Sequence, residues 1–352
     1  MISHLHLEHF RNHEVLDVDL APITVLTGNN GSGKTSVLEA ISMLSLTTSW
    51  KTEKDSEVVS WDDAFCRVIG ADLELVVQRS PYLKRIKIDG ISKRTFQVVG
   101  HLPTILFQPD DLRLLYGSPT ERRQYMDRVI SQTSQAYTQA VVKLAQVLRQ
   151  RNRLLKQIQE GGAGEEELFF WDQQLAELHV VIRVGRETFF AAVNQRLPGI
   201  FAGMVPDGLP VTVQYVSSPA HMHIEEGVDF ERAFLAHLAH SRIKEVSVGA
   251  TLYGPHREDM AVRWGEHPAE SGMSRGQSRS LLVAFKIVEL DYLSTHNENR
   301  PILLLDDIFS ELDAERRERL FGLFGEYQVV MTTTDLGSVK DRLPEGAAVI
   351  EL

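Results

Sequence analysis

The sequence has 352 residues, of which 43% are hydrophobic and 24% are charged, and this composition excludes an intrinsically disordered chain. The formal net charge of −11 excludes a surface coated with basic residues, so any contact with nucleic acid needs a local basic patch. The single cysteine, Cys66, cannot form an internal disulfide, which fits a reducing compartment. The N-terminal residues lack the basic region and apolar core of a signal peptide. Apolar runs in the sequence are much shorter than the roughly 18 residues of a membrane span. We therefore expect a soluble, cytoplasmic protein.

The first 110 or so residues are expected to form a mixed sheet with one helix. Short runs that alternate apolar and polar residues within 1–27 predict a hairpin followed by a buried strand. Strand patterns continue over 64–77 and 84–88, and Asp89-Gly90 is a hairpin-turn signal.

The pattern then becomes helical. No proline or glycine occurs from 120 to 160, where apolar residues recur at helical spacing. A glycine-rich break at 161–164 separates this region from a second helical run over about 165–196, which predicts an αα-hairpin. A mixed segment, 197–246, is expected to complete this lobe.

The C-terminal third returns to alternating strands and helices, typical of an α/β fold. We expect a strand near 247–252, a helix over about 277–294 and a strand at 301–305. A helix over 314–324 and a strand over 328–332 follow.

The strongest motif is an eight-residue P-loop between a buried strand and a helix. Its residues are Gly28, Asn29, Asn30, Gly31, Ser32, Gly33, Lys34 and Thr35. Glycines let successive backbone N–H groups point at a phosphate, and the N-terminus of the following helix adds its dipole. Lys34 is expected to reach the β- and γ-phosphates of ATP, and the hydroxyl of Thr35 to bind Mg²⁺.

A second motif, an apolar strand that ends in Asp306-Asp307, has the Walker B pattern. Asp306 is expected to bind Mg²⁺ through water, and Asp307 to polarise the attacking water. Gln108 follows the apolar run 105–107 and is a candidate for contact with Mg²⁺ and water, although it could equally be a surface glutamine.

A third motif indicates the class of ATPase. Ser274, Arg275, Gly276 and Gln277 precede Walker B by about 30 residues and open a helix. In ABC-type ATPases, such a helix start caps the γ-phosphate of the opposite subunit. Residues 310–313, Ser-Glu-Leu-Asp, fit the D-loop of the same class.

Walker A and Walker B lie about 270 residues apart, with a helical insertion between them. We therefore expect an α/β, ABC/SMC-type P-loop ATPase head from 1–118 and 247–352, and a mostly helical arm from 119–246. ATP would join two heads into a homodimer, because Ser274, Gly276 and Gln277 would complete the site of a second chain.

The chain resembles the RecF family of bacterial recombination mediators, which are related to SMC-type ATPases. Four stretches carry the resemblance, and they are Phe10–His13, Gln108–Asp127, Gly254–Asp259 and Asp306–Arg317. The resemblance implies a weak, DNA-dependent ATPase whose ATP-bound dimer binds duplex DNA near single-strand gaps. It also implies work with RecR and RecO in loading RecA, at the nucleoid.

Two basic clusters are candidates for DNA contact, and in each case the alternative is a solvated surface. One surrounds the turn at 89–90 and includes Lys84, Arg85, Lys87, Lys93 and Arg94. The other is on the first arm helix and includes Arg149, Arg151, Arg153 and Lys156.

Three alternatives remain open. A transporter's nucleotide-binding subunit would carry a switch histidine, whereas Thr332–Asp335 stands at that place. An SMC-like ATPase could serve a nuclease or another DNA-processing partner, although the sequence offers no further acidic metal cluster. An interaction scaffold with an inactive P-loop would lack Lys34 or Asp306, and both are present.

Overall fold

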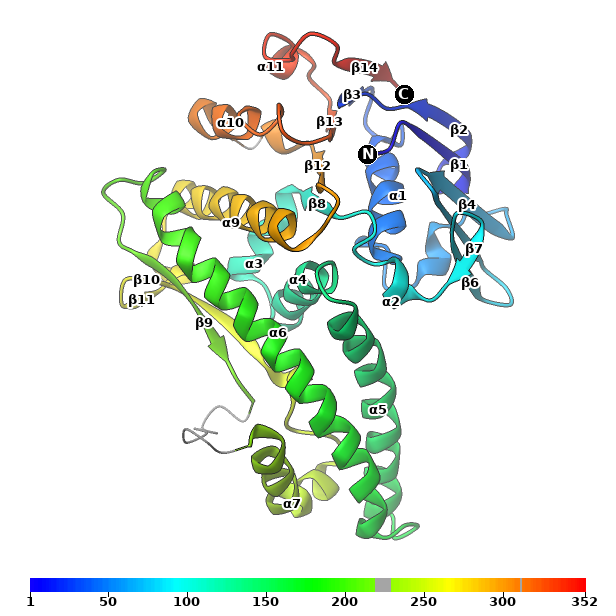
Figure 1. Ribbon diagram of the computed structural model, residues 1–352, viewed down its shortest axis with the longest axis vertical. Coiled ribbons are helices and arrows are strands. Elements are labelled where there is room, and N and C mark those ends of the chain that lie inside the picture. Colours follow the sequence, from blue (N-terminus) through cyan, green and yellow to red (C-terminus); the bar gives the residue numbers. More distant parts are fainter. Residues whose placement is uncertain (219–228, 311) are drawn as a thin grey trace. The chain divides into compact units, whose positions relative to one another are not determined.

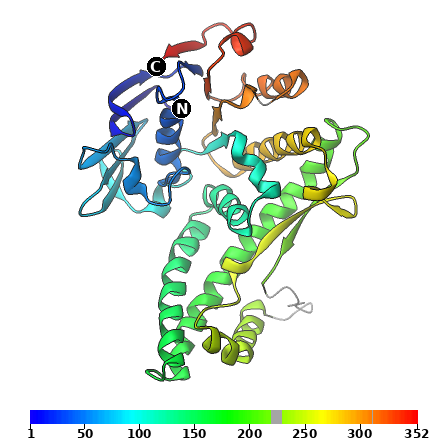
Figure 2. The ribbon, with the colours of Figure 1, turned by 180° about the vertical axis from the view of Figure 1, so that it is seen from behind.

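The computed structural model describes residues 1–218, 229–310 and 312–352. The chain forms two compact units (Figures 1 and 2). The first unit comprises 1–112, 203–206 and 275–352, and the second comprises 113–202 and 207–274.

The first unit contains a six-stranded antiparallel sheet in the order β2-β1-β4-β5-β6-β7. Its strands are β1 (His4–Phe10), β2 (His13–Asp19), β4 (Phe65–Gly70), β5 (Leu73–Gln78), β6 (Leu83–Ile88) and β7 (Ile91–Lys93). The predicted turn between β6 and β7 is confirmed, because Ile88 pairs with Ile91 and both Asp89 and Gly90 have positive φ. Two consecutive positive φ values are the geometry of a tight two-residue hairpin.

The other sheet of the first unit is fully parallel, in the order β14-β3-β13-β12-β8. Its strands are β3 (Ile23–Thr27), β8 (Thr104–Phe107), β12 (Ile302–Asp306), β13 (Val329–Thr333) and β14 (Ala348–Glu351). The central strands are apolar and buried, as expected where both faces of a parallel sheet are covered.

Helix α1 (Lys34–Leu46) contacts strands of both sheets and is buried over most of its surface. The remaining elements of this unit are short helices and turns apart from α9. They are η1 (Asp55–Val58), α2 (Thr95–Val98), η2 (Pro109–Leu112), α9 (Arg275–His296), η5 (Ile308–Ser310), α10 (Ala314–Phe321) and α11 (Gly337–Lys340). Cys66 lies in the core, where burial raises the pKa of its thiol to about 12, so it is not ionised at neutral pH.

The second unit is mainly helical, and its long helices α5 and α6 lie side by side (Figure 1). Its helices are α3 (Arg113–Tyr116), α4 (Pro119–Ser131), α5 (Gln135–Gln159), η3 (Glu165–Glu167), α6 (Leu168–Ala202), α7 (Phe230–Val248), η4 (Pro255–Arg257) and α8 (Ala269–Gly272). A three-stranded antiparallel sheet completes it, formed by β9 (Val211–Val216), β10 (Asp259–Trp264) and β11 (His267–Pro268).

The observed boundaries differ from the expected ones. The expected arm, 119–246, ends before β10, whereas β10 pairs along its length with β9 and belongs to the second unit. The predicted strand near 247–252 is wrong, because α7 continues to Val248 and ends at Gly249 in the left-handed conformation that closes helices. The helical region from 120 to 160 is also two helices, since Ser134 caps a new helix.

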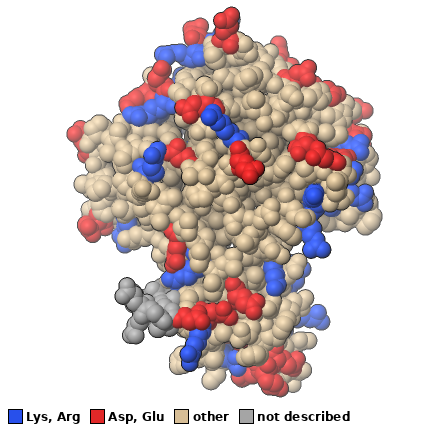
Figure 3. Space-filling view, viewed as in Figure 1, with Lys and Arg blue, Asp and Glu red and all other residues tan. Residues whose placement is uncertain are grey.

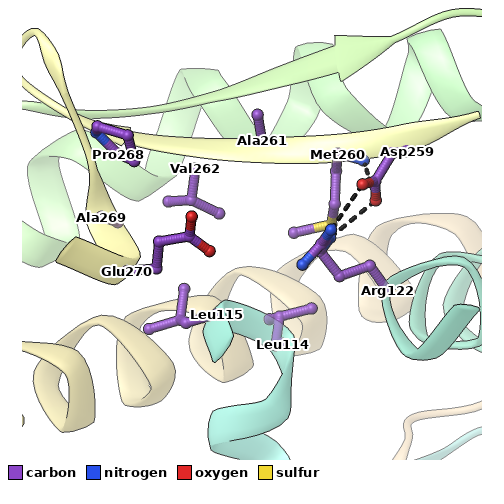
Figure 4. Close-up of a pocket in the computed structure, with 10 residues that line it drawn as sticks. All are labelled: Leu114, Leu115, Arg122, Asp259, Met260, Ala261, Val262, Pro268, Ala269 and Glu270. Atoms are coloured by element: carbon purple, nitrogen blue, oxygen red, sulfur yellow. Dashed lines mark hydrogen bonds and ion pairs between the residues drawn. The ribbon is translucent and has the colours of Figure 1, made fainter. Parts of the chain in front are cut away.

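Parts of two of the stretches that carry the family resemblance, 113–127 and 254–259, lie in the second unit and are joined there by ion pairs. Arg122 of α4 donates two hydrogen bonds to the carboxylate of Asp259, 2.7 and 2.6 Å long (Figure 4). Arg186 of α6 binds Glu258 and Asp127 over 2.8 and 2.9 Å. Burial favours protonation of Glu258, but its bond to His179 and the charge of Arg186 outweigh this and lower the pKa of the carboxyl.

Arg186→Met is expected to lower the free energy of unfolding by about 3–5 kcal/mol, because it leaves the buried carboxylate of Glu258 without the arginine that pairs with it. Urea unfolding followed by circular dichroism measures the loss. Arg153→Met, at an exposed position of α5, is the control and should change stability by no more than about 0.5 kcal/mol. An equal loss in both variants would contradict a structural role for the buried network.

Candidate nucleotide-binding site

The candidate site lies at one edge of the parallel sheet, where the carboxyl ends of four strands meet. Strand β3 leads into the P-loop, and β12 ends at Asp306. β13 lies between them, with Thr332 opposite Asp306 and Thr333 opposite Thr27. β8 pairs with β12 on the far side, so Gln108 follows at the same edge. Ligands of open α/β sheets bind at this edge.

The P-loop has the backbone of an anion-binding loop. Gly28, Gly31 and Gly33 have φ values of 141°, 85° and 103°, a region that favours glycine. A side chain at Gly33 would also collide with the ring of His13. These conformations curl the chain ahead of α1, so that its N-terminus opens into the loop.

Lys34 and Ser32 direct polar groups into this loop. The ammonium of Lys34 donates to the carbonyls of Gly28 and Asn29, both over 2.8 Å, and the side chain is buried. The hydroxyl of Ser32 is buried and has no hydrogen-bond partner among the described residues. A buried hydroxyl without a partner is unusual, and a phosphate oxygen in the loop would satisfy it.

Asp306 joins the Walker B strand to the P-loop helix. Its Oδ1 accepts hydrogen bonds from the hydroxyls of Thr35 and Thr332, each 2.8 Å long. The hydroxyl of Thr332 in turn accepts from the backbone N–H of Asp307 over 3.0 Å. Asp307 has a φ of 50°, which directs the chain sharply away from the strand at this point.

The sequence interpretation named Thr332 only as the start of the stretch that stands in place of a switch histidine, and not as a partner of Asp306. Its role becomes visible only through the register of β12 and β13, which puts the two residues side by side. A threonine at the end of a buried strand gives no separate signal, because Thr is common in strands.

Gln108 directly precedes η2, and the predicted signature residues lie at the start of α9. The backbone N–H of Gln108 donates to Asp111 over 3.0 Å at the start of η2. Gly276 and Gln277 lie in the first turn of α9, and Ser274 directly precedes it. Arg316 of α10 donates to the carbonyl of Gly276 over 2.8 Å and to the hydroxyl of Ser280, which fixes this helix start.

The predicted D-loop lies between η5 and α10. Ser310 donates to the carbonyl of Asp307 over 2.7 Å, and Asp313 caps α10 by accepting from the backbone N–H of Arg316. Glu311, which belongs to the same prediction, lies outside the described residues.

The predicted DNA contacts differ in their surroundings. Lys84 and Lys87 form ion pairs with Asp55 and Glu74 over 2.7 and 2.8 Å, whereas Arg85 is exposed. Arg149 is exposed on α5. The prediction for Arg151 is corrected, because its guanidinium is fully buried and binds Asp172 and Glu245.

A cavity of about 140 Å³ in the second unit is an alternative candidate site (Figure 4). Arg122 at its wall is already bound to Asp259, and the other ionisable side chain that lines it is Glu270. This lining is unsuited to a triphosphate, which carries several negative charges.

The P-loop edge, by contrast, fits ATP and Mg²⁺. The glycine loop, Lys34 and the unpartnered hydroxyl of Ser32 suit phosphate. The hydroxyl of Thr35 and the carboxylate of Asp306 are oxygen donors of the kind that Mg²⁺ prefers, and they already touch.

Residues 1–341 match the model of the RecF/RecN/SMC N-terminal domain. A DNA replication and repair protein RecF from Roseiflexus castenholzii is 36% identical, with 95% of this chain and 93% of that protein covered. A protein of the same description from Heliobacterium modesticaldum is 35% identical, with 95% and 92% covered. A solved structure of the recombination mediator RecF with ATP, in the RecFOR pathway, superposes with a TM-score of 0.87 at 28% identity, covering 95% of this chain and 92% of that one. None of the helices in the described ranges is long and apolar enough to cross a membrane.

Proposed function

Because the chain belongs to the RecF/RecN/SMC family, we propose that it is an ATP-dependent DNA-binding protein of recombinational repair and replication-fork maintenance. The observation that carries the proposal is the contact between Thr35 and Asp306, which joins a complete P-loop to Walker B at one sheet edge. The match over nearly the whole chain to RecF proteins favours this function over that of a transporter subunit.

In this proposal ATP binds with its β- and γ-phosphates in the loop of Gly28–Thr35. Lys34 neutralises phosphate charge, and Thr35 and Asp306 hold Mg²⁺. Asp307 accepts the proton of the attacking water, and Gln108 orients that water. Mg²⁺ supplies charge neutralisation at the γ-phosphate when it is bound.

The protein acts as an ATP-dependent homodimer, in which Ser274, Gly276 and Gln277 of each copy cap the nucleotide of the other. The start of α9 supports this arrangement, because Ser274 and Arg275 are exposed and backbone N–H groups at a helix N-terminus bind anions. Hydrolysis is weak and DNA-dependent, and it times the release of the two copies. RecR and RecO are the proposed partners, and RecA is loaded indirectly, in the cytoplasm at the nucleoid.

DNA contact uses a local basic cluster. On the face in Figure 3, Lys and Arg are scattered among Asp and Glu, without a large basic area. Arg149, Arg153 and Lys156, however, are all exposed and follow the i, i+4, i+7 spacing of one helix face on α5. We propose this stripe as a contact to DNA phosphates, and we propose Arg85, which is exposed on β6 of the first unit, as a separate one.

Changing Arg149, Arg153 and Lys156 together to alanine should weaken ATP-dependent binding of duplex DNA. The slope of log K against log salt should fall by about 0.9 for each phosphate contact that is lost. Fluorescence anisotropy with a labelled duplex, measured with ATP over a salt series, gives both quantities.

The control changes three exposed lysines of the first unit, Lys51, Lys54 and Lys340, to alanine. This variant has the same loss of charge but should keep the salt slope within experimental error. An equal loss of slope in both variants would argue for a general charge effect and against the stripe on α5.

A further inference from the structure

The cavity of about 140 Å³ in the second unit is too small for a nucleotide but has room for one side chain. Small-molecule pockets usually measure about 300–1,000 Å³, whereas a cavity of about 150 Å³ holds a group the size of benzene. Residues of α3, α4, α8, β10 and β11 line it, and all of them belong to the second unit (Figure 4). The occupant that fits is therefore a single side chain or a molecule of that size.

Most of the lining is apolar. Leu114 and Leu115 of α3, Met260 of β10 and Ala269 of α8 are buried hydrophobic residues that face the cavity. A hydrocarbon chain gains free energy when it leaves water for such a surface. The walls therefore favour an occupant with an alkyl stem.

One carboxylate of the lining is unpaired. Arg122 and Asp259 bind each other, and their remaining groups are also used, because Asp259 accepts from the N–H of Met260 over 2.8 Å and Arg122 donates to the carbonyl of Gly117 over 2.9 Å. Glu270, by contrast, forms neither a hydrogen bond nor an ion pair with any residue that the structure describes. With one cation and two carboxylates, the lining has a net charge of −1, which favours a cationic occupant.

Glu270 lies at the rim of the cavity. It is exposed, and Figure 4 shows its side chain extending from α8 toward the apolar residues Val262 and Leu115. A cation that pairs with this carboxylate can keep part of its hydration, so the large cost of burying a charge does not arise. The cavity thus combines an apolar wall for a stem with a hydrated carboxylate for a positive end.

We propose that this cavity binds the side chain of a lysine from a partner polypeptide, with the stem along the apolar walls and the ammonium at Glu270. Lysine has a flexible four-carbon stem and a compact charge, and it keeps that charge hydrated while the stem is buried. Free polyamines share the ammonium chemistry but carry more than one charge, whereas Glu270 is the single unpaired carboxylate among the described lining residues. The charge of the site therefore favours lysine.

The cavity adjoins the segment that leads into the proposed signature motif. The backbone N–H of Met273 donates to the carbonyl of Ala269 over 3.2 Å, which joins α8 to the chain directly before Ser274. A partner whose lysine packs on α8 would therefore lie beside the start of that motif. The lysine site itself does not depend on nucleotide binding, because its lining includes no residue of the P-loop or Walker B.

The test follows the Met260 signal by NMR in protein with ¹³C-labelled methionine methyl groups. Met260→Leu identifies the signal. The probe is N-acetyl-lysine N-methylamide, and it should cause a saturable shift of Met260, which lines the cavity. N-acetyl-norleucine N-methylamide has an alkyl stem but no ammonium, and it should bind about 5-fold more weakly, the upper end for an ion pair open to solvent.

Glu270→Gln removes the charge with little change of shape, so it should weaken the lysine probe about 5-fold and leave the norleucine probe unchanged. Glu266→Gln is the matched control, because Glu266 is exposed in the turn between β10 and β11, outside the lining. It should bind both probes as the wild-type protein does. Ala269→Leu keeps Glu270 but fills part of the cavity, and it should abolish binding of both probes.

Four outcomes would overturn the proposal. No shift of Met260 with the lysine probe would exclude the site. Equal affinity of the wild-type protein and Glu270→Gln would remove the role of charge. Unchanged binding in Ala269→Leu would place the lysine on the outer surface rather than in the cavity. Tighter binding of cadaverine than of the lysine probe would identify the occupant as a free polyamine and exclude a partner polypeptide.

Discussion

Lys34→Ala is expected to raise the Kd for ATP at least about 30-fold and to abolish ATP-dependent dimerisation. The ammonium of Lys34 is buried and lies against the carbonyls of Gly28 and Asn29, at the centre of the loop. Loss of a buried cation opposite a phosphate costs about 2–5 kcal/mol, which corresponds to about 30- to 4,000-fold in affinity. Calorimetry with ATP and static light scattering measure the two effects.

Lys51→Ala, at an exposed position of the same unit, is the control and should bind ATP as the wild-type protein does. Circular dichroism would confirm that both variants are folded. If Lys34→Ala bound ATP with ordinary affinity, the nucleotide would have to be located away from Gly28–Thr35.

Ser274→Arg should leave ATP binding by the monomer intact but prevent dimerisation and hydrolysis. Ser274 is exposed and directly precedes α9, whose first turn is proposed to meet the γ-phosphate of the second copy. A long side chain there would obstruct this approach. Light scattering with and without ATP measures dimerisation, and phosphate release measures hydrolysis.

The same substitution at Ser271, three residues earlier and also exposed, is the matched control. Ser271→Arg should still dimerise with ATP. Ser271 lies in α8, three residues before Ser274, and so is outside the helix start that is proposed to meet the γ-phosphate. An ATP-induced dimer of Ser274→Arg would refute capping in trans while leaving the P-loop assignment untouched.

The local motifs could be predicted from the sequence because their function depends on residue type and spacing along a few positions. The P-loop, the helix that follows it and the apolar strand before Asp306 lie where the pattern predicts them. Thr35 and Asp306 were both expected to bind Mg²⁺, which implied that they lie close together, although 271 positions separate them.

Features that depend on packing could not be predicted in the same way. The break between α4 and α5 contains neither glycine nor proline, and it is made by the side chain of Ser134, which accepts from the N–H of Tyr137. The strand expected near 247–252 is the end of a helix, because tertiary packing of α7 against α6 outweighs the local alternation.

For Arg151, the sequence contained a signal for burial, but the positive charge of the side chain led to the prediction of an exposed DNA contact. It lies four residues after Val147 and four before Leu155, both of which are buried on α5. Helical spacing therefore indicated the inner face for Arg151. Its burial depends on Asp172 and Glu245, which come from other helices and cannot be located from the spacing along α5.

The strand order of the parallel sheet has a consequence for synthesis on the ribosome. Among the described residues, β3, which leads into the P-loop, pairs with β13 and β14 alone, whereas the six-stranded antiparallel sheet is built from 4–93. The chain must therefore grow by about 300 residues beyond Thr27 before β13 exists to pair with it. At about 5–20 residues per second this takes about 15–60 s. During that time the nascent chain can form its six-stranded antiparallel sheet but has no β13 to pair with β3, so the nucleotide site can be assembled only after β13 has been synthesised.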